Sequence, residues 1–325
     1  MKSAIMWLPG IILVLSIASI AKIFGHFFPS IGGVLFALLI GIIIRNSLNI
    51  DEKFTEGIDL VVKKWLKVAI ILLGATLSFR SILDIGAQSI LVIIFVVTGG
   101  ILVTLLVGKI LKIDHTLSLL IGAGTSICGA TAISVLKGVL HARESVVAYA
   151  ISTIFFFNIL ATFLYPVLGQ WLHLSALQMG IWAGVSIHDT SSVVAVGYLL
   201  GDDVGEVATT VKLVRTLFIL PLVLAISFIA VRRSEGTTSI KAAFPLFIIG
   251  FLIMSGAYSI GVIPEHISGY LGATAKFLIV MVMAGVGLQV QWKNIRGLGM
   301  QPFVAGFVAA LFVGVFSLLF ILYLV

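Results

Sequence analysis

Charged residues are scarce in this chain. Aspartate, glutamate, lysine and arginine make up only 10% of its 325 residues, whereas a soluble domain carries roughly 25%. The sequence also lacks any long polar stretch that would form a separate soluble domain. This shortage of charge argues against an ordinary soluble protein and favours one whose surface lies largely in a membrane.

Cysteine is nearly absent as well, since it occurs once, at Cys128. A single cysteine excludes an internal disulfide and any zinc site built from several cysteines, and we expect neither a metal nor a cofactor. The net charge of +7 does not indicate nucleic acid binding. The lysines and arginines fall mainly in short loops between apolar segments, where such residues orient a membrane protein.

Apolar residues are what the chain has in excess. They form 60% of the sequence, the mean hydropathy is +1.24, and about eleven stretches approach the ~20 residues needed to cross a bilayer. These stretches are 4–24, 31–46, 62–79, 86–108, 116–136, 144–168, 176–200, 207–231, 242–260, 271–289 and 302–325. We therefore predict an all-α polytopic membrane protein with about 9–11 transmembrane segments, forming one integral membrane transporter domain over residues 1–325.

Two of these segments, 116–136 and 176–200, contain polar interruptions rich in glycine. The first includes Ala123-Gly-Thr-Ser-Ile-Cys128, and the second repeats its pattern as Ala183-Gly-Val-Ser-Ile-His188. An opened backbone is tolerated in hydrocarbon only where protein or water satisfies it. Paired interruptions of this kind indicate the binding site of a transporter.

We predict that the helices break near Gly124–Gly129 and Gly184–Asp189 and that the breaks meet near the membrane midplane. The loop charges place the N-terminus in the cytoplasm and the C-terminus outside. Lys137 and Arg143 would then face outward if segment 116–136 crossed the membrane. They become cytoplasmic if that segment enters and returns, with the second segment returning from the opposite face. Broken helices that do cross are the alternative.

A further sign of a transporter is a faint internal repeat. Leu73–Leu77 matches Ala284–Leu288, and the charge count makes the two segments run in opposite directions. Secondary transporters are commonly built from inverted repeats, and we predict them here.

The candidate site residues are hydroxyls, small groups and cations in or beside the two interruptions. For substrate binding they are Thr125, Ser126, Cys128, Gly129, Thr131, Ser186, Ser191, Lys212 and Arg215. Lys212 and Arg215 share one helix face, and a guanidinium suits an oxyanion, although structural ion pairing explains the two cations equally well. His188 and Asp189 are the candidates for proton coupling, because histidine changes charge near neutral pH.

Three ordered motifs of this chain resemble the YeiH-type family of bacterial sulfate exporters. They are Thr125–Ile133, Ala183–Asp189 with Val193–Gly197, and Val211–Arg215 with Pro221. The resemblance implies the cation/proton antiporter and anion transporter superfamily, with inverted repeats and interrupted helices that cross each other. It also implies a multi-pass protein of the bacterial plasma (inner) membrane.

We therefore expect a secondary transporter, and no enzyme, that exports a small anion such as sulfate with a proton or sodium as coupling ion. Its other expected partners are the lipid bilayer and a second copy in a homodimer. One alternative is a cation/proton antiporter or an ion channel in which Asp189 carries the ion. Another is an intramembrane hydrolase built on Ser186, His188 and Asp189. It is the weakest, because neighbours on one helix do not easily form a catalytic relay.

Overall fold

The computed structural model describes residues 2–28, 32–48, 50–232, 245–291 and 299–324. Over these residues the chain is helical and contains no β-strand, which confirms the predicted all-α membrane fold. Six of the described helices are long and apolar enough to cross a bilayer: Met6–Phe27, Phe79–Ile110, Glu144–Trp171, Asp202–Phe228, Glu265–Gln289 and Met300–Tyr323. The other predicted segments are shorter helices or broken runs of helix.

The chain divides into two compact units. Unit 1 comprises Met1–Leu83, Val194–Gly201 and Leu246–Lys293, and unit 2 comprises Asp84–Val193, Asp202–Pro245 and Asn294–Val325. The sequence predicted one domain over 1–325, and that remains a prediction about how the chain behaves as a whole.

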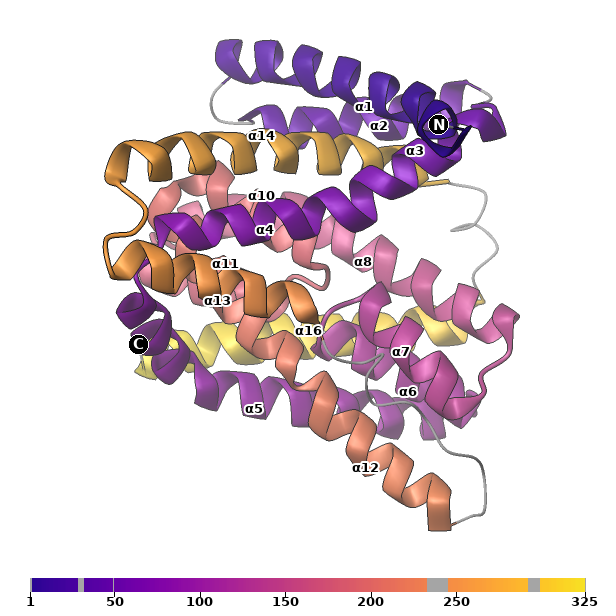
Figure 1. Cartoon of the computed structure of the whole chain (residues 1–325). Coiled ribbons are helices and arrows are strands. Elements are labelled where there is room, and N and C mark those ends of the chain that lie inside the picture. Colours follow the sequence, from indigo (N-terminus) through magenta and orange to yellow (C-terminus); the bar gives the residue numbers. More distant parts are fainter. Residues whose placement is uncertain (1, 29–31, 49, 233–244, 292–298, 325) are drawn as a thin grey trace. The chain divides into compact units, whose positions relative to one another are not determined.

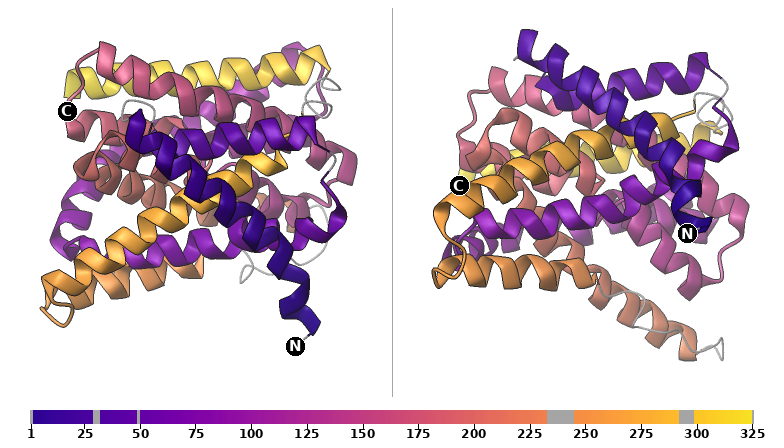
Figure 2. Two further views of the ribbon diagram at one scale, coloured as in Figure 1. Left: turned by 90° about the horizontal axis from the view of Figure 1, so that it is seen from above. Right: turned by 45° about the horizontal axis from the view of Figure 1, so that its top comes forward.

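Unit 1 is a set of helices that cross at glycines. Its helices are α1 (Lys2–Phe27), α2 (Gly32–Ser47), α3 (Thr55–Leu60), α4 (Leu66–Leu73), α13 (Leu246–Ser259) and α14 (Glu265–Gln289). The helices α1, α2 and α14 cross one another (Figure 2). A Cβ atom on Gly287 would lie 2.4 Å from the carbonyl oxygen of Leu38. Only glycine therefore permits this backbone contact, as is common between membrane helices.

The two segments of the faint repeat run in opposite directions within unit 1, as predicted. Gln289 Nε2, at the end of α14, donates to Asp59 Oδ1 at 2.8 Å. Thr76 lies against Gly272, near the beginning of α14. The chain from α3 to α4 is thus antiparallel to α14. Inverted repeats across the whole chain stay a prediction.

Unit 2 contains the two predicted interruptions. Its helices are α5 (Phe79–Ile110), α6 (His115–Ser126), α7 (Ala130–Leu140), α8 (Glu144–Trp171), α9 (Ala176–Ser186), α11 (Asp202–Leu217), α12 (Ile219–Arg232) and α16 (Met300–Leu324). The first residues of α5 belong to unit 1, and α10 (Thr190–Leu200) is shared between the units.

The first interrupted segment enters and returns on the same side. Ser118 of α6 lies against Gly108 of α5, so α6 runs back along α5. Helix α7 then folds back on α6, because the Ile133 side chain lies against Gly124. Figure 1 shows α6 and α7 beside the end of α5 and the beginning of α8. This arrangement matches the predicted re-entrant segment and not the alternative, a broken helix that crosses the membrane.

The second interrupted segment also returns to the side from which it came. Val207 lies against Gly180, and Val211 lies against Gly184, so α9 and α11 run parallel from a common end. Residues 187–201 must therefore travel back along the length of α9 before α11 begins. Because α9 is antiparallel to α8, this second hairpin enters from the opposite end to the first.

The loop charges of unit 2 are sorted between its two ends. One end, which we call the basic end, carries the loops 111–114 and 141–143 with Lys109, Lys112, Lys137 and Arg143. The other, which we call the acidic end, carries the loop 172–175 and the start of α11 with Asp202 and Asp203. The re-entrant hairpin thus places Lys137 and Arg143 with the other basic residues, which is what the charge pattern predicted.

Candidate functional site

The two breaks meet inside unit 2, as predicted. They fall at residues 127–129 and 187–189, and a Cβ atom on Gly129 would lie 3.5 Å from Asp189 Cα. Gly129 has φ 65° and ψ −133°, a backbone conformation that glycine reaches without a steric cost. We call the two breaks, with the Lys212 and Arg215 side chains that hold them, the junction.

Lys212 ties both breaks to α11. Its Nζ donates to the carbonyl oxygens of Ile127 at 3.0 Å, Ile187 at 2.8 Å and His188 at 2.6 Å. The three hydrogen bonds that Nζ donates match the three donors of an ammonium group. The side chain is fully buried.

Arg215, one turn further along α11, ties the ends of α6 and α9, just before the breaks, to the same helix. Its Nε donates to Ser126 O at 2.6 Å, and its Nη1 and Nη2 donate to the carbonyl oxygens of Val185 and Thr125. These carbonyls carry the negative ends of the α6 and α9 dipoles. The guanidinium thus faces backbone oxygens, and its predicted part in substrate binding stays a prediction.

Asp189 closes the beginning of α10. Its Oδ2 accepts from Ser191 N at 2.9 Å and from the Ser191 hydroxyl, which satisfies donors that a helix N-terminus leaves free. Asn158 of α8 fixes this arrangement, because its Oδ1 accepts from Asp189 N at 2.9 Å and its Nδ2 donates to Ser192 Oγ at 2.7 Å. Asn158 was absent from our predicted site, although an isolated amide in an apolar segment was a visible signal.

The other predicted hydroxyls and small groups are distributed around the junction. Ser186 Oγ shares a 2.7 Å hydrogen bond with Ser317 Oγ of α16, a partner 131 residues away in sequence that no motif indicated. Ser126 Oγ is buried and has no hydrogen-bond partner among the described residues. Thr125 and Cys128 are buried, whereas Thr131 is exposed on α7.

His188 lies beside an apolar cavity of about 190 Å³ within unit 2. The cavity walls come mainly from α8 and α16 and include the rings of Tyr165 and Trp182. The imidazole is buried, and neither of its nitrogens has a hydrogen-bond partner among the residues that the structure describes. An unpaired buried polar group costs free energy, which makes His188 an unexplained polar group beside the cavity.

The formal charges of the side chains at the junction do not cancel. Lys212 and Arg215 count as two positive charges and Asp189 as one negative charge, which leaves a formal excess of one positive charge. The two helix C-termini and two helix N-termini that meet here offset each other. Helix α7 begins at Ala130, and its N-cap residue, Gly129, has no side chain to cap it, while the Asp189 carboxylate beside it accepts from Ser191 instead. This arrangement favours a bound anion.

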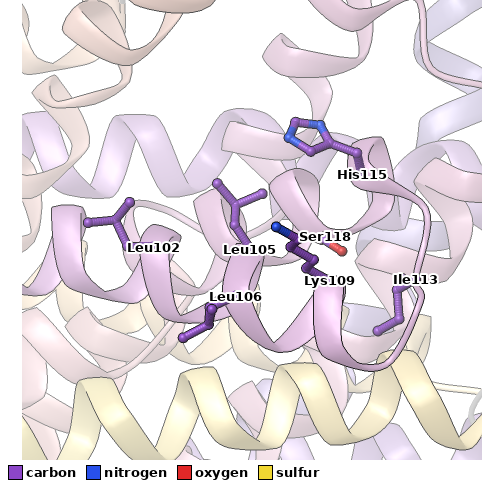
Figure 3. Close-up of a pocket in the computed structure, with 7 residues that line it drawn as sticks. All are labelled: Leu102, Leu105, Leu106, Lys109, Ile113, His115 and Ser118. Carbon is purple, nitrogen blue, oxygen red and sulfur yellow. The ribbon is translucent and has the colours of Figure 1, made fainter.

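Outside the junction, the described residues contain weaker candidates for a binding site. They hold no group of three or more histidine, cysteine, aspartate or glutamate residues that could bind a metal ion. A hollow of about 470 Å³ opens between α5 and α6 at the basic end (Figure 3). Its walls are mainly leucine and isoleucine, with Lys109, His115 and Ser118 among them. Such a lining suits an acyl chain better than a hydrated anion.

Comparison with known proteins identifies the family to which the chain belongs. The family model described as Conserved hypothetical protein 698 matches residues 9–306. The chain belongs to this family. Its relatives include a UPF0324 membrane protein of Clostridium tetani, 38% identical with 95% of each chain covered. Those of Fusobacterium nucleatum and Streptococcus pneumoniae are 35% and 38% identical, with 92% and 86% of each chain covered.

The UPF0324 relatives are named as membrane proteins, and the six long apolar helices agree with that name. This member of the family is therefore a multi-pass membrane protein. The names of these relatives identify a family and state no substrate, so the predicted sulfate export is treated below as a proposal.

Proposed function

We propose that the protein is a secondary transporter of a small oxyanion, with sulfate as the first candidate. The observation that carries this proposal is the meeting of two hairpins, entered from opposite ends, at a buried point with an excess positive charge. Secondary transporters place their substrates at such interrupted helices, where half-helix N-termini face the anion.

The two half-helices that begin at the junction, α7 and α10, differ in one respect that supports anion binding at α7. Helix α10 has the Asp189 carboxylate at its N-terminus, whereas α7 has only Gly129 there. A substrate oxyanion would supply at α7 the negative group that α10 already contains. The hydroxyls of Ser126 and Thr131 are the nearest candidates to add donors, and Lys212 and Arg215 would stabilise the bound charge through space.

The loop charges support a proposed orientation of the chain in the membrane. Positive loops face the cytoplasm, so the basic end of unit 2 would be cytoplasmic and the C-terminus of α16 would lie outside. In unit 1, the Trp7 carbonyl lies against Gly57, at the end that carries Lys53 and Lys63. The N-terminus would therefore be cytoplasmic as well.

A panel of anions tests the substrate. We expect sulfate, or another tetrahedral oxyanion such as phosphate, to stabilise the purified protein by about 2.7 kcal/mol at a hundred times its dissociation constant. The measurement is thermal unfolding at constant ionic strength, with nitrate, chloride and small carboxylates as comparisons. If no anion raises the unfolding temperature above the ionic-strength control, the proposed substrate class is wrong.

The alternative is a cation/proton antiporter or an ion channel that uses Asp189. The carboxylate is half-buried but already accepts two hydrogen bonds from Ser191, which makes it a weaker ion ligand. Stabilisation by sodium with the anion held constant would favour this alternative. Saturable flux in proteoliposomes would indicate a carrier rather than a channel.

Proton coupling through His188 is a further part of the proposal. A proton on the imidazole would add positive charge beside Lys212 and Arg215 and would tighten anion binding, so we expect tighter binding at acid pH. The His188→Gln variant is expected to bind with an affinity that changes much less between pH 5 and 8. An unchanged pH profile in that variant would assign the coupling proton to another group, such as Asp189.

We also propose that the protein is not a hydrolase. Ser186 pairs with Ser317, and Asp189 pairs with Ser191, so the described contacts do not join Ser186, His188 and Asp189 in a relay. The coupling ion and a homodimer in the lipid bilayer stay predictions.

A further inference from the structure

Helix α7 has a polar face that is open to its surroundings. The exposed positions along it are Thr131, Ser134, Gly138 and His141, while Ala132, Ile133, Leu136 and Val139 on the other face are buried. A Cβ atom added to Gly138 would meet nothing within 4 Å. Among the described residues, the exposed positions therefore extend from the basic end to the first turn of α7.

This polar face contrasts with the exposed surfaces of the neighbouring helices. On α5 the exposed side chains include Leu102 and Leu106, and on α16 they include Leu311 and Leu319, as expected for helices that contact lipid. The Ser134 hydroxyl donates to Ala130 O at 2.8 Å, but the helix N-terminus has no side-chain cap. Unpaired N–H groups are costly in hydrocarbon, where no water is present to bind them. The open face of α7 is therefore suited to water.

The corresponding half-helix of the second hairpin, α10, is buried over its first residues. Thr190 is 8% exposed, Ser191 and Ser192 are 1% exposed, and the four residues after them are fully buried. The two hairpins are thus unequal in this structure. One offers an exposed polar surface leading to the junction, and the other offers none over these residues.

We propose that the polar face of α7 is one wall of a water-filled path that leads a hydrated oxyanion from the basic end to the junction. The 11 residues of α7 span about 16 Å, roughly half of the 30 Å hydrocarbon layer. Arg143 at its mouth would raise the local concentration of anions, whereas Lys137 beside it is paired with Glu144. The identity of the solute rests on the proposed function, whereas the presence of water does not.

Cysteine labelling tests the path directly, because the only native cysteine, Cys128, is buried and can be replaced by alanine in the background. The test variants are Thr131→Cys, Ser134→Cys and Gly138→Cys. The matched controls are Leu102→Cys and Leu106→Cys on the lipid-facing side of α5, and Ile133→Cys on the buried face of α7. The reagent is a membrane-impermeant maleimide, applied to vesicles of either orientation.

We expect the three test cysteines to react about tenfold faster or more than the controls, because the reactive thiolate forms poorly in hydrocarbon. The reaction is expected only from the side that the basic end faces. Rates equal to those of Leu106→Cys, or equal labelling from both sides, would overturn the path. Labelling that appears only after a dimer is dissociated in detergent would also overturn it, because a second copy would then cover this face.

Sulfate or phosphate in the labelling buffer separates this proposal from the proposed function. Slower labelling of Thr131→Cys than of Gly138→Cys would place the anion at the inner end of the path. Rapid labelling that no anion slows would leave the path standing and count against an anion as substrate. Anion stabilisation without labelling would retain the function and refute the path.

Discussion

The Arg215→Gln variant is expected to lose about 3–5 kcal/mol of stability, as is typical when a buried charged group is removed from its partners. The guanidinium is fully buried and donates to the ends of both α6 and α9. Glutamine is shorter and has a single donor group, so it would leave several of these carbonyl oxygens unpaired. It would also remove the excess positive charge, and we expect anion-dependent stabilisation to be lost with it.

Thermal and denaturant unfolding in detergent measure this effect. Lys109→Gln is the matched control, since it removes an exposed cation from the same unit and is expected to change stability by no more than about 0.5 kcal/mol. Arg215→Lys keeps the charge but loses the forked donors, so it should retain anion binding with reduced stability. Wild-type stability in Arg215→Gln would show that the guanidinium does not hold the hairpins.

The Gly129→Ala variant is expected to be destabilised by about 1–3 kcal/mol through backbone strain alone. A Cβ atom at this position would make only ordinary contacts, the nearest at 3.5 Å, so steric overlap is not the cause. The cause is the positive φ of 65°, which alanine rarely adopts. Because relief of the strain would turn the first N–H groups of α7 away from the junction, anion binding should weaken as well.

Gly138→Ala provides the control for this prediction on the same helix. Gly138 lies inside α7 with free space around it, so alanine there is expected to stabilise the helix by about 0.5–1 kcal/mol. The two glycine substitutions should thus differ in sign when unfolding is compared side by side. Equal effects would mean that the conformation of Gly129 is not required.

The position of the breaks could be read from the sequence. Glycines and hydroxyls at 124–129 and 184–189 identified both, and Lys137 with Arg143 favoured hairpins over crossing helices. Backbone carbonyls, however, have no sequence signature. The sequence therefore showed Lys212 and Arg215 as cations on one helix face, without showing that they would bind helix ends.

Other parts of the site depended on distant segments. Ser317 meets Ser186 only because α16 packs against α9, and no pattern in the sequence connects the two. The loop charges alone left open whether the broken helices cross the membrane, and the glycine contacts of α9 with α11 show that the second one returns. No polar linker in the sequence marks the two compact units either.

The hydrogen bonds of Lys212 and Arg215 also limit how the protein can move. Both hairpin tips are fastened to one rigid helix, α11, so separating them would expose several carbonyl oxygens and two cations at once. A transport cycle that kept these bonds would move both hairpin tips and α11 together as one rigid body. The binding site would then move with this body, and the surface against which the body slides would form the permeability barrier.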